Sequence, residues 1–390
     1  MKLLAQDGHN AGQKISTAIT AGIIDGAIVS AKCHEKDRVT DFITANLDPQ
    51  SHVVLFDPEF YAGALIDADS LGKLETHDYF KSNLSKSDFK PKSVIEFAEK
   101  TQQAQIEYGL QQYLSPVTII EGFNSFSSGQ AYNMYLASID ACDNPEEKLI
   151  LSLVVTHASL SKKNEIEAFL NDITTLEVKG FYVVVDRSSS YSSIWNNPQE
   201  LAGLLLLVNV LSTAGYEVHV GYTDASGLLC LGAGATSIAT GWFKNLRIFK
   251  HSRYYTSGGR NPKQAYFSSK LMNFTIVEDE LSQVVALGLS DQVMSGVDGD
   301  NELIETIDDP VWNQNMQLMN YWASLKGVIT ELEAADNPID FIESKVDAAI
   351  ATYRKLSASG VTFDTETGIT QVERYKEAIS IYRGWKNDII

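Results

Sequence analysis

The feature that most constrains this fold is a repeated alternation of short apolar runs with longer segments of helical periodicity. Such an alternation is typical of successive βα units, whose strands assemble into a parallel sheet. We expect eight strands, and eight parallel strands are enough to close a barrel. The strands are predicted at residues 3–8, 26–32, 52–59, 117–122, 149–157, 180–187, 218–223 and 235–241.

These units predict an α/β fold, a TIM-type (β/α)8 barrel with a helical C-terminal extension. A doubly wound open sheet could show similar local patterns, but eight units without an internal topological break favour the closed barrel. We expect the barrel in residues 1–250, a basic aromatic-rich segment in 251–277, and a helical extension in 278–390 that partly completes the barrel. Helices of that extension are predicted at 279–288, 311–334, 338–356 and 371–385.

Two stretches inside the barrel are predicted to lack regular structure. Residues 60–92 exceed the usual loop length, so they could form a lid or contain a short helix of no functional consequence. The sequence GLLCLGAG at 227–234 is glycine-rich and is predicted as a short turn into the eighth strand.

Segments for export or membrane insertion are not evident in the sequence. The first residues lack the apolar core of a secretory signal, and no run of 18 apolar residues occurs. Cys33, Cys142 and Cys230 are far apart and odd in number, which argues for a reducing compartment and against a thiolate zinc site. We therefore expect a cytoplasmic protein with no membrane partner.

Positive charge is concentrated in one interval of an otherwise acidic chain. The net charge is −19, yet no acidic residue occurs between Asp224 and Glu278. Aromatic residues interleave with the cations there, a composition that suits nucleic acid because cations neutralise phosphates while rings stack on bases. The alternative is a segment whose positive charge docks against the acidic remainder of the molecule. The cations are Lys244, Arg247, Lys250, Arg253, Arg260, Lys263 and Lys270.

Polar or ionisable residues end all eight predicted strands. In a (β/α)8 enzyme, catalytic side chains sit at the carboxyl ends of the strands, where they share one cavity. A carboxylate that ends an apolar run is half-buried, so its desolvation must be offset by partners or by a substrate. The candidate catalytic residues are Asp186, Asp57, His157, Lys32, Glu121 and Asp7, with the carboxylates as nucleophile or base and His157 or Lys32 as proton donor.

A metal ion is the competing interpretation of the same strand ends. Their oxygen and nitrogen atoms could ligate one, but the spacing Asp7-Gly8-His9 is not the His-x-His of barrel metallohydrolases. Lys32 also does not follow the strand that usually bears a Schiff-base lysine. We therefore predict no metal and no cofactor.

The corner between the seventh and eighth strands is predicted to bind an anion. Loops after these strands often hold a phosphate on backbone N–H groups and a short helix. Gly241 is followed by WFKNLR, which could form a one-turn helix facing the cavity, although glycines nearby could merely shape a tight turn. The candidate substrate- or anion-binding residues are Arg187, Tyr222, Gly241, Lys244, Arg247, Arg253 and Arg260.

The layout of strand-end aspartates and a basic appendage is broadly similar to that of the tRNA-guanine transglycosylases, barrel enzymes that act on bases in nucleic acid. Their zinc-binding cysteine cluster and substrate-loop motif are absent here, so no catalytic residue carries over and no family is assigned.

The sequence leaves two functional hypotheses. The first is a barrel enzyme, a hydrolase or transferase, that performs acid/base or glycosyl-type chemistry on a phosphate-bearing substrate such as a nucleotide or nucleic acid. The second is a catalytically inactive barrel that binds a protein partner or oligomerises through its basic segment and helical tail. Trp312, Met319 and Trp322, expected to be exposed on that tail, motivate the second hypothesis.

Overall fold

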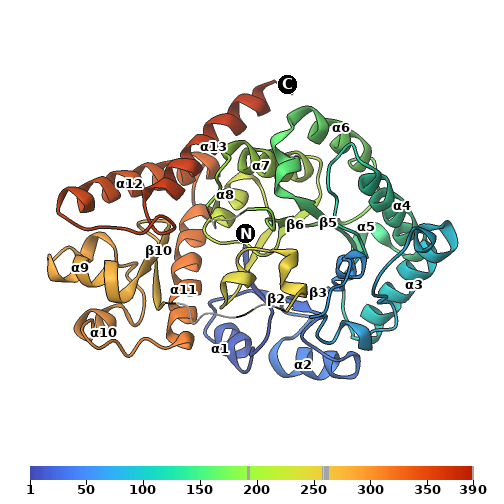
Figure 1. Cartoon of the computed structure of the whole chain (residues 1–390), viewed down its shortest axis with the longest axis horizontal. Coiled ribbons are helices and arrows are strands. Elements are labelled where there is room, and N and C mark those ends of the chain that lie inside the picture. The colour runs from blue at the N-terminus through green and yellow to red at the C-terminus, as the bar shows by residue number, and fades with distance from the viewer. Residues whose placement is uncertain (191–193, 257, 259–262, 389–390) are drawn as a thin grey trace.

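Eight parallel strands form one nearly closed barrel in the computed structural model, which describes residues 1–190, 194–256, 258 and 263–388 (Figure 1). The strands are hydrogen-bonded in the order β3-β2-β1-β8-β7-β6-β5-β4. They are β1 (Lys2–Gln6), β2 (Gly26–Ser30), β3 (Val53–Asp57), β4 (Tyr113–Leu114), β5 (Leu149–Thr156), β6 (Gly180–Asp186), β7 (Glu217–Val220) and β8 (Ser237–Thr240). The barrel prediction is confirmed.

Helices follow the strands and surround the barrel (Figure 1). They are α1 (Lys14–Thr20), α2 (Val39–Asn46), α3 (Pro91–Glu107), α4 (Phe126–Ala141), α5 (Pro145–Lys148), α6 (Lys163–Ile173), α7 (Pro198–Thr213) and α8 (Ser226–Ala233). Because helices cover the outer face and packed side chains fill the interior, the strands are apolar on both faces. All seven residues of β6 are buried, for example.

The fourth strand departs from its predicted position. Only Tyr113–Leu114 pairs with β5 as a strand, and the predicted range 117–122 contributes a single bridge between Ile120 and Val155. Pro116 lies between the two pieces, and proline cannot donate the backbone hydrogen bond that a central strand requires. This interruption also leaves β3 and β4 without a ladder between them.

The glycine-rich turn predicted at 227–234 is wrong, because the chain there forms helix α8. Its glycines permit close packing: a Cβ at Gly227 would lie 2.6 Å from the Thr223 hydroxyl. Gly234 ends the helix at φ 116°, the left-handed conformation that glycine adopts without strain.

The irregular stretch predicted at 60–92 contains three short 3-10 helices. They are η2 (Phe60–Ala64), η3 (Leu74–Thr76) and η4 (Lys86–Phe89). Tyr61, Leu74 and Tyr79 of this stretch are buried in the core, so the segment packs onto the barrel.

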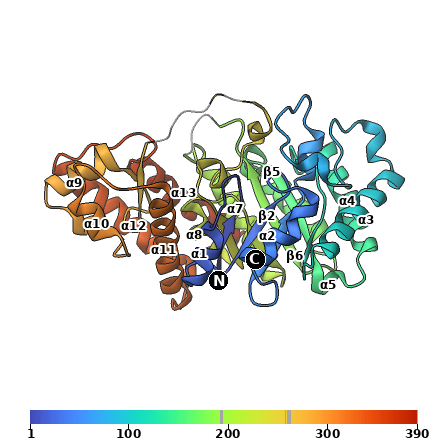
Figure 2. The same cartoon turned by 90° about the horizontal axis from the view of Figure 1, so that it is seen from below.

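The C-terminal extension, together with the end of the basic segment before it, forms a lobe beside the barrel (Figures 1 and 2). It contains an antiparallel hairpin and five helices: β9 (Ala265–Ser268), β10 (Asn273–Ile276), α9 (Ser282–Ala286), α10 (Asp300–Glu305), α11 (Gln314–Glu333), α12 (Pro338–Ala358) and α13 (Ile369–Asn387). Helix α11 packs against β1, and its Trp322 indole donates to the carbonyl of Thr240 at the end of β8, at 3.2 Å. Helices α12 and α13 pack against α8 and α7.

The tail tryptophans are not exposed, contrary to the expectation from sequence. Trp312 and Trp322 are fully buried and Met319 is partly buried, because α11 uses its apolar face to cover the barrel. The observation that motivated an assembly role for the tail is therefore lost.

Candidate functional site

The strand-end residues singled out by sequence do gather at the carboxyl ends of the strands, but in two different environments. Asp7, Lys32 and Asp57 lie at the ends of β1, β2 and β3, where they are buried. His157 and Asp186 lie at the ends of β5 and β6, beside residues that solvent reaches. We call the first group the inner cluster and the second the rim.

Asp57 is at the centre of the inner cluster, with only 1% of its surface exposed. One carboxylate oxygen accepts from the backbone N–H of Glu59 at 3.0 Å. The other accepts from the hydroxyls of Tyr61 at 3.0 Å and Tyr182 at 3.1 Å. Burial, together with the nearby Glu59 carboxylate, raises the pKa of Asp57 to about 7. Both carboxylate oxygens are thus already occupied by protein donors.

Lys32 is also enclosed. Its Nζ donates to the carbonyls of Ser70 at 2.5 Å and Arg253 at 2.6 Å, and lies 4.7 Å from the centre of the Tyr254 ring. Burial lowers the pKa of Lys32 to about 8. Glu59 accepts from the hydroxyls of Tyr254 and Ser30. Residues from the short helix η7 (His251–Tyr254) therefore cover the inner cluster from above the barrel.

Asp7 and Glu121 complete the sequence-based catalytic set. One Asp7 oxygen accepts from the backbone N–H of Ser30 at 3.2 Å and lies 2.6 Å from His34 Nε2. Its other oxygen has no hydrogen-bond partner among the described residues. Glu121 follows the interrupted fourth strand and is exposed, and its carbonyl accepts from the hydroxyl of Thr156, the residue before His157, at 3.0 Å.

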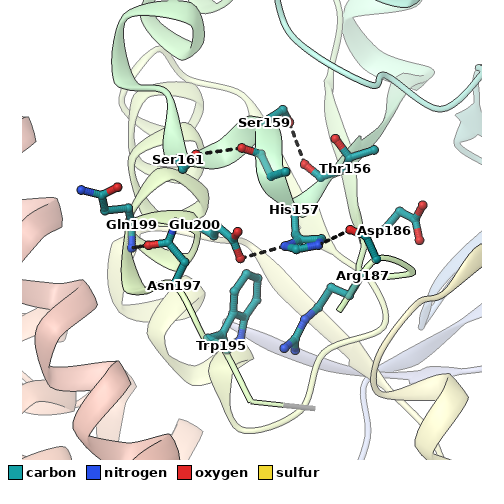
Figure 3. Close-up of polar contacts among 12 residues, drawn as sticks. Thr156, His157, Ser159, Ser161, Asp186, Arg187, Trp195, Asn197, Gln199 and Glu200 are labelled. Carbon is teal, nitrogen blue, oxygen red and sulfur yellow. Dashed lines mark hydrogen bonds and ion pairs between the residues drawn. The ribbon is translucent and has the colours of Figure 1, made fainter. Parts of the chain in front are cut away.

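His157 begins the rim, and both of its ring nitrogens are engaged (Figure 3). Nδ1 lies 2.8 Å from the Glu200 carboxylate, and Nε2 lies 2.6 Å from the Ser189 hydroxyl. Glu200 is in the first turn of α7, where the helix dipole favours a negative charge. The side chains of His157 and Glu200 are each 13% exposed.

Asp186 forms a second carboxylate–histidine pair at the rim. It accepts from the Ser188 hydroxyl at 2.5 Å and lies 2.7 Å from His251 Nδ1. Burial would raise the pKa of Asp186, but the hydrogen bonds from His251 and Ser188 outweigh it and lower that pKa. The hydrogen bond to Asp186 raises the pKa of His251 above 6.5, partly opposed by burial. The His251 side chain is 38% exposed, so the pair is open to solvent.

A partly enclosed pocket lies between the ends of β6 and β7 and the surrounding helices. Three predicted anion-binding residues line it: Arg187, Tyr222 and Arg247. Trp195 also lines it, with its ring 4.3 Å from the Arg187 guanidinium. Figure 3 shows Arg187 and Trp195 together below His157.

A buried donor without an acceptor distinguishes this pocket. Within the described chain, the Trp195 indole N–H has no hydrogen-bond partner, although the residue is only 3% exposed. The Tyr222 hydroxyl is also unpartnered there, but it lies near Arg253, Glu59 and Asp57 of the inner cluster. Arg247 forms no ion pair with any described residue, and its guanidinium lies over the rings of Phe274 and Tyr321. Burial lowers the pKa of Arg247, and Asp224, also in the pocket lining, partly opposes that effect. The lining is therefore rich in donors that an anion would satisfy.

The remaining anion-binding candidates do not line this pocket. The predicted one-turn helix is the 3-10 helix η6 (Lys244–Leu246), but Lys244 points to solvent and pairs with Glu366 at 2.7 Å. Gly241 allows a close chain approach, since a Cβ there would lie 2.7 Å from the Gln6 carbonyl oxygen. Arg253 lies over the Tyr222 ring in the inner cluster, and Arg260 falls outside the described residues.

The aromatic residues of the basic segment are not available for stacking on bases. They face the core, as the antiparallel hairpin and η7 place their rings against the barrel and the tail. The buried ones are Trp242, Phe249, Tyr254, Tyr266 and Phe267. Among the cations, Lys263 pairs with Asp279 and Lys250 donates to the Ser190 carbonyl, which agrees with docking against the acidic remainder.

Four residues of the rim and the pocket were not predicted from the sequence: Ser189, Glu200, His251 and Trp195. Ser189 belongs to a serine run directly after an apolar strand, and Glu200 follows Pro198 at a helix start. Those signals mark loops and helix ends in general. No local pattern links them to His157, because Glu200 is 43 residues away along the chain.

No protein-family model matches the chain, and no curated protein matches it significantly. Across the described ranges, no group of three or more His, Cys, Asp or Glu side chains is arranged to hold a metal ion. None of the helices in those ranges is long and apolar enough to cross a membrane.

Proposed function

We propose that this protein is a barrel enzyme that performs acid–base chemistry, of the hydrolase or transferase type, on a small phosphate-bearing substrate. The observation that carries the proposal is the pocket at the ends of β6 and β7. There the buried Trp195 indole N–H has no acceptor among the described residues, and the Arg247 guanidinium makes long contacts, of 3.4 and 3.5 Å, with the Phe243 and Trp242 carbonyls. Leaving such a donor unpaired costs about 1–3 kcal/mol, and the oxygens of a phosphate would remove that cost.

The Asp186–His251 pair is the proposed acid–base group. Asp186 orients the imidazole, and its hydrogen bond to the ring raises the pKa of His251, which favours proton transfer through this histidine. Arg187 directly follows Asp186, so the end of β6 supplies Asp186 to the acid–base pair and Arg187 to the pocket. A phosphate held by the pocket would bring the rest of its molecule to the rim.

Phosphate binding tests the pocket with minimal changes. Calorimetric titration with inorganic phosphate should show weaker binding for Trp195→Phe and Arg247→Gln, each of which removes a donor that lines the pocket. A lost hydrogen bond to a charged group is worth about 1.5–3 kcal/mol, so each variant should lose roughly 10-fold or more in affinity.

Lys244→Gln is the matched control, because it removes a cation close in sequence whose side chain points to solvent. It should leave phosphate affinity unchanged. Wild-type phosphate affinity in both pocket variants, with a loss only in Lys244→Gln, would instead identify a surface charge effect and contradict the pocket.

Turnover tests the acid–base pair. Nucleoside monophosphates and sugar phosphates should be screened for conversion by mass spectrometry with the full chain. For a converted compound, His251→Gln and Asp186→Asn should lower kcat by about 100-fold, the usual contribution of a general acid or base, while phosphate affinity persists. Full activity in both variants would eliminate this role for the pair.

A further inference from the structure

Three rim residues from separate parts of the chain form one continuous line of hydrogen bonds. Glu200 Oε2 lies 2.8 Å from His157 Nδ1, and His157 Nε2 lies 2.6 Å from Ser189 Oγ (Figure 3). A carboxylate can only accept, so Nδ1 carries the proton and Nε2 is the acceptor for the Ser189 hydroxyl. This is the arrangement in which a histidine can remove a proton from a serine.

The positions of the three side chains are well supported. His157 starts the 3-10 helix η5 (His157–Ser161), which is held to the end of β5 by the Ser159 hydroxyl on the Thr156 carbonyl, at 2.7 Å. Glu200 is fixed by α7, which has proline in its first turn and an Asn197 cap. A rigid base and a rigid orienting group reduce the cost of reaching a reactive geometry.

The hydroxyl at the end of this line is accessible. Ser189 is exposed, whereas His157 and Glu200 are largely covered. A substrate can therefore reach Ser189 from solvent while the base remains sheltered behind it. This separates Ser189 from Ser188, whose hydroxyl is already bound to Asp186.

Positive charge lies next to Ser189. Lys250 Nζ donates to the carbonyl of the following residue, Ser190, at 2.6 Å. Attack of an oxygen on a carbonyl creates a negative charge, and cations near that point stabilise it.

We infer that Ser189, His157 and Glu200 form a nucleophilic triad that hydrolyses a carboxylic ester at the rim. Ser189 Oγ bonds to the carbonyl carbon as its proton passes to His157 Nε2. The carbon–oxygen bond to the alcohol then breaks, and His157 returns the proton to the leaving alkoxide. Water, deprotonated by His157, releases the carboxylic acid and restores the serine. Glu200 is a positioning residue, since it acts through His157.

A fluorophosphonate probe tests the nucleophile directly. The full-length protein should be labelled on Ser189, as located by peptide mass spectrometry, and should hydrolyse p-nitrophenyl acetate. Ser189→Ala should abolish labelling and lower ester turnover by at least 100-fold. Ser161→Ala is the matched control, because its hydroxyl lies in the same region but donates to the Ala158 carbonyl; it should behave as wild type.

Glu200→Gln separates positioning from structural support. It should lower kcat by at least 10-fold with little change in KM, because the ester still binds but the neutral amide no longer stabilises the imidazolium that forms on His157. Labelling that persists in Ser189→Ala, or ester turnover equal to wild type in that variant, would overturn the triad.

This inference stands apart from the phosphate pocket, and the two can fail separately. Arg247→Gln should leave fluorophosphonate labelling of Ser189 unchanged. Conversely, Ser189→Ala should bind inorganic phosphate with wild-type affinity. Loss of phosphate binding in the pocket variants, with intact labelling, would support both assignments.

Discussion

The inner cluster and the rim contain the same kinds of side chain at equivalent strand ends, yet these side chains differ in how far their partners are exposed to solvent. Asp57 is 1% exposed and both of its oxygens accept hydrogen bonds from the protein. Asp186 is equally covered, but its partner His251 is 38% exposed and can meet a solute. A charged strand end thus becomes a candidate for chemistry only when its partner reaches solvent.

The covering segment explains this difference. In η7, the Tyr254 hydroxyl donates to Glu59, and the Arg253 carbonyl accepts from Lys32 Nζ. Groups of the protein itself therefore satisfy the charged residues of the inner cluster. On the rim, the same segment contributes the His251 ring and leaves its outer edge open. We therefore expect substitutions of the inner cluster to alter stability, and substitutions of the rim to alter binding and turnover.

The largest contrast should come from two glutamates. Glu59→Ala leaves the buried hydroxyls of Ser30 and Tyr254 without their acceptor, so the free energy of unfolding should fall by about 2–5 kcal/mol. Glu200→Ala removes a hydrogen bond at the rim and should cost about 1 kcal/mol or less. Urea unfolding of both variants measures the difference; equal losses would remove the distinction between the two regions.

The pH dependence of stability should reveal Asp57. Its pKa is about 7 in the folded protein and 3.8 without burial, so the folded state holds its proton more tightly. Stability should therefore fall as pH rises from about 4 to about 7, by up to about 4 kcal/mol from this group. Asp57→Asn should flatten that fall, as measured by unfolding at about pH 4.5 and about pH 7.5. An unchanged pH slope in the variant would show that Asp57 is ionised without penalty.

The smallest effect concerns the titration of His251. Its pKa is raised by Asp186, so any stability that it contributes is present below 6.5 and is lost as pH rises through the higher folded value. In Asp186→Asn, the His251 pKa should move down, and NMR titration of the imidazole nitrogens would record this. The free energy of unfolding should change little, because solvent screens a half-exposed pair. A pKa that stays in place would show that Asp186 does not hold His251.

Much of the barrel could be predicted from sequence, while the site could be predicted only in part. The strand-end rule placed Asp57, His157 and Asp186 at one end of the barrel, and two further strand-end candidates, Arg187 and Tyr222, line the pocket with Arg247 from the segment after Gly241. It could not reveal that His157 pairs with Glu200, or that Asp186 pairs with His251 from beyond β8. Such pairs depend on the course of the loops, which have no periodicity.

The sequence by itself determined the eight-stranded barrel, because strands covered on both faces require uninterrupted apolar runs and their ends must be polar. The interruption of the fourth strand at Pro116 was not predicted, because the apolar run at 117–122 has the pattern of a whole strand. Only the tertiary structure decided which charged ends are sealed and which are open, since burial depends on segments distant along the chain. The covering of Asp57 and Lys32 by η7 and the exposure of Ser189 and His251 both depend on such distant segments.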